Sequence, residues 1–356
     1  MKWEKVRLKK LITIKNGKDH KELEEGIYPV YGSGGCMRYV NQYLYDKVSI
    51  LLPRKGTLNN IQYVDRPFWT VDTCYYTEIF EDVVEPYFLF LQLKLKDINS
   101  LNTGAAVPSM TFDKYYSIEI SLPPLPTQRR IADILSAYDD LIENNRKQIK
   151  LLEEAAQRLY KEWFVDLRFP GHEKVKVTDG VPEGWEKGKI EQLACFSRGQ
   201  MIISDDVIPG DVPVVAGGLQ PSCYHNKANT TSPVVTVSAS GANAGYIRLY
   251  FVDVFASDCS FIDGRSCSCV YFVYCFFRND VRILRNLQHG SAQPHVYASQ
   301  INDIALTIPN RKLIKTFEDI VKSYFEEIAF KEKQIKLLQE ARDRLLPKLM
   351  SGEIEV

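Results

Sequence analysis

Two long stretches of the chain, residues 126–165 and 310–350, place apolar side chains at alternating steps of four and three. This heptad spacing predicts two helices, each with an apolar edge that packs against another helix. The expected seam positions of the first helix are Leu135, Tyr138, Ile142, Asn145, Ile149, Leu152 and Leu159, and those of the second are Tyr324, Ile328, Lys331, Ile335, Leu338 and Leu345. Asn145 and Lys331 occupy the same position of the pattern, and polar seam residues fix helix register at a cost in stability.

Side chains near the ends of these stretches indicate where the helices begin and stop. Thr127 and Asn310 are suitable N-caps, because their side-chain oxygens can accept a backbone N–H of the first turn. The second helix is expected to end near Pro347, since proline lacks the N–H that a helix needs. Two helices in the core of one globular domain would show the same pattern. Two matching copies instead favour pairing with each other.

The chain is an internal duplication. Residues 148–159 read QIKLLEEAAQRL and residues 334–345 read QIKLLQEARDRL, which are identical at nine of twelve positions with an offset of 186. The same offset pairs Pro123 with Pro309. Closer to the N-terminus the offset is 182, which pairs Trp3 with Trp185 and Gly17 with Gly199. A repeat of this length means two copies of one structural unit, the first of them shorter by small loop deletions.

Short β-branched runs separated by glycine and proline turns precede each helix. Residues 48–52, 117–120 and 234–237 are such runs and predict strands. Residues 270–277 form a continuous apolar run, which is typical of a strand buried on both faces. Each repeat therefore consists of a strand-rich part followed by a helix.

These elements predict an α+β fold with two mixed α/β domains separated by two long antiparallel helices. The expected parts are a first domain at 1–125, a helical spacer at 126–165, a linker at 166–184, a second domain at 185–309, a second spacer at 310–350 and a tail at 351–356. A helix of this length spans about 55 Å at 1.5 Å per residue. Two similar domains on a stiff spacer suit a two-part target, such as DNA half-sites about 34 Å apart.

Composition excludes some function classes and leaves others open. The 356 residues carry 45 basic and 45 acidic side chains, so net charge gives no support for nucleic-acid binding and does not exclude a local basic surface. No apolar run approaches the roughly 18 residues that span a bilayer, and no secretory signal is present, so we expect a cytoplasmic protein without membrane contact. The eight cysteines form no CxxC pair, which fits a reducing compartment.

Sequence motifs of catalysis are missing. The chain has no GxxxxGK[ST] phosphate loop, no GxGxxG after a strand, and no Asn/Asp-Pro-Pro-aromatic motif for methylating a flipped base. We therefore expect no catalytic residue. The cysteines at 259, 267, 269 and 275, with His225 as a possible partner, have spacings that fit a zinc site poorly. We therefore interpret them as buried thiols and expect no metal.

Several stretches together resemble the specificity subunits of type I restriction–modification systems. They are the tryptophan near the start of each repeat, YPVYG at 28–32, LLPRKGT at 51–57, GAAVP at 104–108, PPLPTQRRIA at 123–132, LYKEWF at 159–164 and LPKLMSG at 346–352. The resemblance covers essentially the whole chain. The second repeat departs from the pattern, with PNRKL at 309–313 and SGAN at 240–243 in place of the proline-rich and RKGT stretches.

The resemblance implies a non-catalytic subunit that reads a bipartite site in double-stranded DNA. It also implies docking of two methyltransferase subunits, joined in the complete enzyme by two motor-nuclease subunits. S-adenosylmethionine, ATP and Mg²⁺ are then expected on those partners, and no cofactor on this chain.

Candidate DNA-binding residues lie in polar, glycine-containing loops. Arginine and lysine can bond guanine, and asparagine and glutamine can bond adenine, although the same loops also suit solvated turns. The candidates are Ser33, Arg38, Arg54, Lys55, Thr57, Asn59, Asn60, Ser240, Asn243, Gln293 and His295.

Two other functions remain possible at this stage. A coiled-coil adaptor could use the strand-rich domains to bind proteins, and salt-sensitive, sequence-dependent DNA binding would separate it from a DNA reader. A stand-alone modification enzyme or nuclease would reveal itself by activity of the isolated chain.

Overall fold

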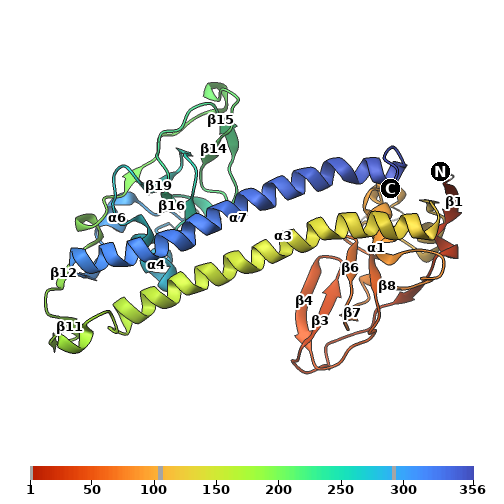
Figure 1. Ribbon diagram of the computed structural model, residues 1–356, viewed down its shortest axis with the longest axis horizontal. Helices are drawn as coiled ribbons and strands as arrows, with labels where there is room; N and C mark the ends of the chain where they lie inside the picture. The colour runs from red at the N-terminus through yellow and green to blue at the C-terminus, as the bar shows by residue number, and fades with distance from the viewer. Residues whose placement is uncertain (1–2, 103–106, 291–293) are drawn as a thin grey trace. The chain divides into compact units, whose positions relative to one another are not determined.

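The computed structural model describes residues 3–102, 107–290 and 294–356. It divides into two compact units, unit 1 with Met1–Glu143 and Ile335–Val356, and unit 2 with Asn144–Gln334. The two long helices are α3 (Leu125–Tyr160) and α7 (Arg311–Ser351), and each contributes residues to both units. Figure 1 shows α3 in yellow to green and α7 in blue.

Besides its parts of α3 and α7, the described residues of unit 1 form three small sheets and two short α-helices. The first sheet pairs β1 (Glu4–Arg7) with β9 (Glu119–Leu122). The second has the strand order β2 (Ile12–Asn16), β8 (Cys74–Ile79), β5 (Ser49–Pro53), β6 (Gln62–Val64). The third has the strand order β4 (Gly35–Val40), β3 (Tyr28–Gly32), β7 (Trp69–Thr70). The helices are α1 (Pro86–Lys94) and α2 (Phe112–Tyr116).

Unit 2 repeats this topology strand for strand. Its first sheet pairs β12 (Glu186–Lys189) with β20 (Ala305–Ile308). The second has the strand order β13 (Ser197–Arg198), β19 (Cys259–Asp263), β16 (Val234–Ser238), β17 (Ile247–Tyr250). The third has the strand order β15 (Cys223–His225), β14 (Val212–Val215), β18 (Phe255–Ala256). The helices are α4 (Val270–Asn279), α5 (Arg282–Arg285) and α6 (Ala298–Asn302), and a hairpin of β10 (Val177–Thr178) and β11 (Val181–Pro182) precedes the sheets. The duplication seen in the sequence is therefore a duplication of the fold, and the predicted α+β class is confirmed.

The prediction of a strand at 270–277 is wrong, because these residues form helix α4. A continuous apolar run has no period, so it cannot distinguish a buried strand from a buried helix. Most side chains of α4 are buried, including Phe272, Cys275 and Phe277, which explains why the run carries no polar face. Helix α4 is the counterpart of α1 in unit 1.

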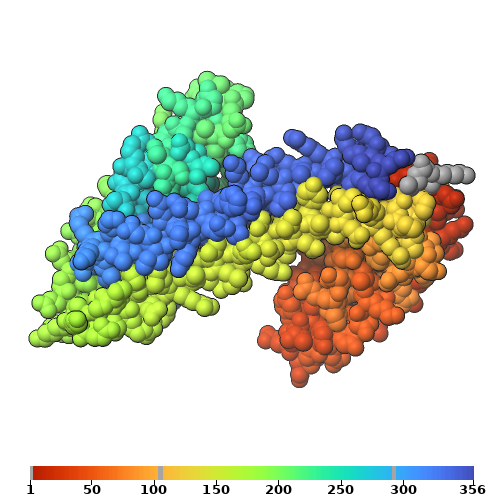
Figure 2. All heavy atoms as spheres, viewed as in Figure 1, coloured from red at the N-terminus to blue at the C-terminus, as the bar shows by residue number. Residues whose placement is uncertain are grey.

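The helices α3 and α7 run antiparallel in each unit. In unit 1, Ile131 of α3 lines one small cavity with Gly352, which follows α7. Asp139, later in α3, forms an ion pair with Arg342, earlier in α7. In unit 2, the rings of Tyr160 and Phe317 lie 6.0 Å apart. In Figure 2 the yellow start of α3 and the dark blue end of α7 lie side by side in unit 1. Packing of both helices supplies part of each unit's core.

The helix ends follow only some of the sequence signals. Asn310 is confirmed as an N-cap, since its Oδ1 accepts the N–H of Leu313 at 2.9 Å. The N-cap assigned to Thr127 is wrong: α3 already begins at Leu125, and the carbonyl of Pro124 accepts the N–H of Thr127 at 2.9 Å.

The second helix also continues past Pro347 to Ser351, so its predicted end is wrong. Leu349 and Met350, just beyond the proline, are buried in the core of unit 1. Their burial offsets the hydrogen bond that the proline removes.

Candidate nucleic-acid interface

A set of backbone hydrogen bonds holds the loop after β5 in unit 1. The N–H of Gly56 donates to Pro108 at 2.9 Å, and the N–H of Met110 donates to Arg54 at 3.0 Å. The N–H of Arg54 donates in turn to Thr73 at 2.9 Å. We call this arrangement of residues 54–56, 73 and 108–110 the loop frame of unit 1.

The same frame recurs in unit 2, with residues 239–241, 258 and 294–296. The N–H of Gly241 donates to Pro294 at 3.0 Å, that of Val296 to Ala239 at 3.0 Å, and that of Ala239 to Asp258 at 3.2 Å. Lys55 faces Ser109 in unit 1 as Ser240 faces His295 in unit 2. Because these contacts use backbone atoms, the frame tolerates different side chains, and the two units differ in them.

The frame of unit 1 carries cations. The Arg54 guanidinium lies 5.9 Å from the ring centroid of Tyr75 and donates to the carbonyl of Asp72 at 3.4 Å, which holds it beside the loop. Lys55 and Thr57 are exposed. Two cations and a hydroxyl on one loop can bond phosphates or the acceptor edge of guanine.

Other predicted residues of unit 1 hold loops in place. The Asn60 amide donates to the carbonyl of Ser33 at 2.8 Å, which ties the frame loop to the turn after β3. Asn59 Oδ1 accepts the N–H of Asn99 at 3.2 Å. Arg38 extends from β4 and donates to the carbonyl of Leu23 at 2.8 Å, a contact that does not involve the frame.

The frame of unit 2 borders a cavity of about 450 Å³. Its lining residues are Arg198, Met201, Ala239, Ser240, Asp258, Ser260, His295, Val296, Tyr297 and Ala298. The Ser240 hydroxyl forms a hydrogen bond with Asp258 Oδ2. The rings of His295 and Tyr297 stack nearly parallel, with centroids 6.0 Å apart. The structure thus places Ser240 and His295 together at one cavity.

The remaining two candidates of unit 2 lie elsewhere. The Asn243 amide donates to the carbonyl of Gly217 at 3.3 Å, which supports the turn after β14. Gln293 lies outside the described residues.

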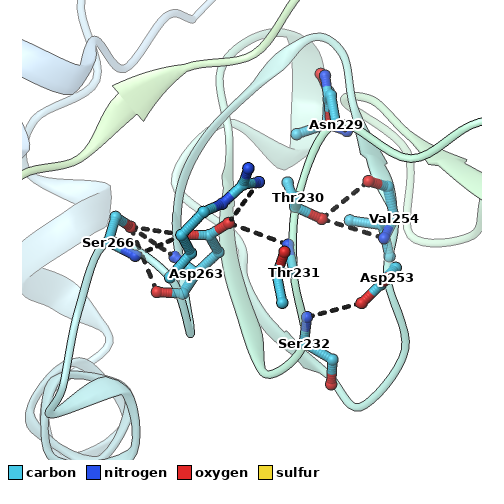
Figure 3. A network of polar contacts seen from close by, with 10 residues as sticks. Asn229, Thr230, Thr231, Ser232, Asp253, Val254, Asp263 and Ser266 are labelled. Atoms are coloured by element: carbon cyan, nitrogen blue, oxygen red, sulfur yellow. Dashed lines mark hydrogen bonds and ion pairs between the residues drawn. The ribbon is translucent and has the colours of Figure 1, made fainter.

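A polar network around the buried Asp263 and Thr230 holds the segment before β16 (Figure 3). The Asp263 carboxylate accepts the N–H of Thr231 at 2.9 Å and the hydroxyl of Ser266 at 2.7 Å. Thr230 and Asp253 bind backbone groups of Val254 and Ser232, so the segment before β16 is fixed on both sides. Burial raises the pKa of Asp263, but these hydrogen bonds outweigh it and hold the pKa below its ordinary value.

Sequence reasoning missed the side chains that complete this cavity, above all Arg198, Asp258 and Tyr297. They lie far apart in the chain, on β13, just before β19 and just before α6. The repeat itself could have pointed to them, because Asp258 stands where unit 1 has Thr73 in the matching frame.

The seam positions predicted from the heptads are all buried or half-buried. Leu135, Ile142, Asn145 and Ile328 are buried, and the others are half-buried, namely Tyr138, Ile149, Leu152, Leu159, Tyr324, Lys331, Ile335, Leu338 and Leu345. The ammonium of Lys331 reaches Glu327 at 3.0 Å, so this polar seam residue has its own ion pair.

The cysteines show no metal-ligand geometry. Cys267 and Cys269 have sulfur atoms 3.7 Å apart, but no group of three or more His, Cys, Asp or Glu side chains that could hold a metal occurs in the part of the chain that the structure describes. Among the same residues, no helix is long and apolar enough to cross a bilayer.

Comparisons with known proteins agree on one family. The model of the type I restriction modification DNA specificity domain matches residues 1–154 and 182–340, one match for each repeat. The type I restriction enzyme MjaIX specificity subunit of Methanocaldococcus jannaschii is 25% identical over 347 residues, covering 88% of this chain and 79% of its own. The type I restriction enzyme HindI specificity subunit of Haemophilus influenzae is also 25% identical, covering 77% and 78%.

A solved structure shares the fold. The crystal structure of the S subunit of a type I restriction–modification system from M. genitalium aligns with a TM-score of 0.72 over 98% of this chain and 96% of that one, at 17% identity.

Proposed function

Because the chain belongs to the family of type I restriction–modification DNA specificity proteins, we propose that it reads a bipartite site in double-stranded DNA, one half-site with each unit. The observation that supports this proposal is the loop frame, which has the same backbone contacts in both units and different side chains. The matching backbone conformation of the two loop frames presents side chains in the same way. Because the side chains differ between the units, they select different bases. Two different half-sites follow from this arrangement.

In this proposal the chain has no catalytic role. Two methyltransferase subunits, and in the complete enzyme two motor-nuclease subunits, supply the chemistry and hold S-adenosylmethionine, ATP and Mg²⁺. The absence of phosphate-loop and methyltransferase motifs from the sequence supports this division of labour.

A domain exchange tests the proposal. Residues 185–309 are replaced by the equivalent region of a relative, and the chimera is produced with the methyltransferase subunits of this system. Mapping modified sites across a genome should show one half-site changed and the other unchanged. A parent complex that modifies no defined site, or a chimera that changes both halves, contradicts the proposal.

Binding to duplex DNA separates the proposal from a protein adaptor. A DNA reader neutralises phosphates with its cations, so its affinity should fall steeply as salt rises from 50 to 200 mM. Preference for the mapped target over a scrambled duplex should persist at both salt concentrations. An adaptor would bind both duplexes equally weakly.

A further inference from the structure

The cavity of unit 2 has a polar wall made of hydrogen-bond acceptors. Asp258 Oδ2 accepts a hydrogen bond from the Ser240 hydroxyl, which leaves the Ser240 oxygen with acceptor capacity only. Among residues 3–102, 107–290 and 294–356, no group donates to Asp258 Oδ1. Asp258 is half-buried and lines the cavity, so within the described residues its Oδ1 keeps acceptor capacity for a ligand in the cavity.

The rest of the lining suits a flat ligand that approaches from solvent. Tyr297 is 53% exposed and stacks on His295, and Met201 is 69% exposed, so apolar side chains border the polar wall. Concave sites with apolar borders and a few placed polar groups are typical of ligand pockets. Arg198, also in the lining, supplies a cation that can bond a neighbouring phosphate.

We infer that Asp258 determines part of the base specificity of unit 2 by accepting a hydrogen bond from the exocyclic amino group of a cytosine or adenine. This inference rests on the proposed function. A carboxylate can only accept, so the amino groups of these two bases satisfy it, whereas the keto oxygens that guanine and thymine present at the same positions repel it. Asp258 therefore selects for an amino-bearing base and against a keto-bearing one.

Comparison with unit 1 indicates that Asp258 selects between bases and does not raise the overall affinity for DNA. At the matching frame position unit 1 has Thr73, and its frame loop carries Arg54 and Lys55 where unit 2 has Ala239 and Ser240. A negative charge at a DNA-facing surface is repelled by phosphates and weakens binding to every sequence. The negative charge of Asp258 contributes discrimination between bases, because its repulsion excludes the wrong base.

The test uses the full chain in complex with the methyltransferase subunits. Modified sites are mapped for the parent, for Asp258→Asn and for the control Asp253→Asn. Asn at position 258 can still accept the Ser240 hydroxyl, and its amide can also donate to a keto oxygen, so the fold is retained while the selection is lost. Asp253 lies outside the cavity lining and accepts the N–H of Ser232, a bond that an asparagine oxygen can also accept. Its variant therefore removes the same charge elsewhere in unit 2 and keeps that contact.

We expect the parent to require cytosine or adenine at one position of the half-site read by unit 2. Asp258→Asn should accept guanine or thymine there, with the preference for the amino-bearing base reduced on the order of 10-fold. The other half-site should be unchanged, and Asp253→Asn should match the parent at every position.

Synthetic duplexes identify the base and do not depend on any variant. At each position of that half-site, cytosine is replaced by its analogue without the 4-amino group, or adenine by purine. Binding affinity of the parent complex is measured in place of modification, because deleting the amino group that accepts the methyl group would by itself abolish modification. The affinity should fall on the order of 10-fold at one position only. Loss with the cytosine analogue assigns cytosine, and loss with purine assigns adenine.

Two results separate the inference from the proposed function. If the parent has a defined target and Asp258→Asn modifies that target with unchanged preference, the inference is overturned and the proposed function stands. The same holds if no amino-deleted base in that half-site reduces binding. If the parent has no defined target, both are overturned.

Discussion

The carboxylate of Glu318, in α7, accepts a hydrogen bond of 2.5 Å from the backbone N–H of Phe272, the third residue of α4. Helix α1, the counterpart of α4, is capped by its own N-cap residue, Glu85, which accepts the N–H of Tyr87 at 3.1 Å. The N-cap residue of α4 is Cys269, whose side chain makes no cap hydrogen bond. In both units a carboxylate therefore lies at the positive N-terminal end of the helix. It comes from α7 for α4 and from the N-cap residue itself for α1.

Stability of unit 2 should fall as pH rises because of Glu318. Burial raises its pKa to about 8, more than the N–H groups of Phe272 and Tyr271 lower it. The folded chain therefore keeps a proton that the unfolded chain loses above about 4.5, and the stability that this proton contributes is lost between about pH 4.5 and 8. Glu318→Gln keeps the acceptor and carries no titrating proton. Urea unfolding midpoints at pH 5 and pH 8 should differ less in this variant than in the parent.

Glu326→Gln is the matched control, since Glu326 is exposed on the same helix and pairs with Lys322 at 3.7 Å. Its midpoints should follow the parent at both pH values. Equal pH dependence in the parent and in Glu318→Gln would contradict the burial argument.

Asp139 and Arg342 should be coupled in unit 1. Asp139 accepts hydrogen bonds from Arg342 of α7 and from the Tyr87 hydroxyl of α1, so one carboxylate joins three helices. Both charged side chains are about one-third exposed, so solvent screens the pair and we expect a coupling energy of about 1 kcal/mol. Unfolding of Asp139→Ala, Arg342→Ala and the double variant measures it. Strictly additive effects would show that the ion pair contributes nothing.

Burial should decide the cost of shortening seam residues. Ile328 is 2% exposed and Ile149 is half-buried, and both belong to unit 2. Ile328→Ala should therefore cost about 2–5 kcal/mol of unfolding free energy. Ile149→Ala should cost about 1–2 kcal/mol, since less apolar area returns to water. Denaturant titration of both variants checks the order, and the reverse order would disprove the seam geometry.

Gly17 and Gly199, which the repeat pairs, should tolerate no side chain. A Cβ at Gly17 would lie 2.1 Å from the carbonyl oxygen of Val71, and one at Gly199 would lie 2.2 Å from that of Ser257. Alanine at either position must displace backbone, which should cost about 2–3 kcal/mol in its own unit. Gly34→Ala is the control, because no atom lies within 4 Å of its added Cβ. Thermal unfolding in which all three variants match the parent would refute the close approach.

The sequence by itself determined the architecture, because repeats and heptads are local patterns that survive in a single chain. The 186-residue offset predicted two copies of one unit, and both copies have the same strand order. The alternating four and three spacing predicted α3 and α7, whose seam residues are buried or half-buried. Periodicity shows which face of a helix is apolar. An apolar face is enough to predict that the helix forms and packs against another element.

Tertiary structure decided what depends on contacts between distant residues. The apolar run at 270–277 forms helix α4, most of whose side chains belong to the core of unit 2, and no local period records which element such a run forms. Asn59 and Asn60 are of the residue types that can bond bases, and only the folded structure shows that they also make hydrogen bonds with Asn99 and Ser33. Asp258 gave no signal of its own, and it became a candidate only because the fold brings Ser240 and His295 to the same cavity. A hydrogen bond across the chain depends on the positions of both partners, and only the folded backbone sets those positions.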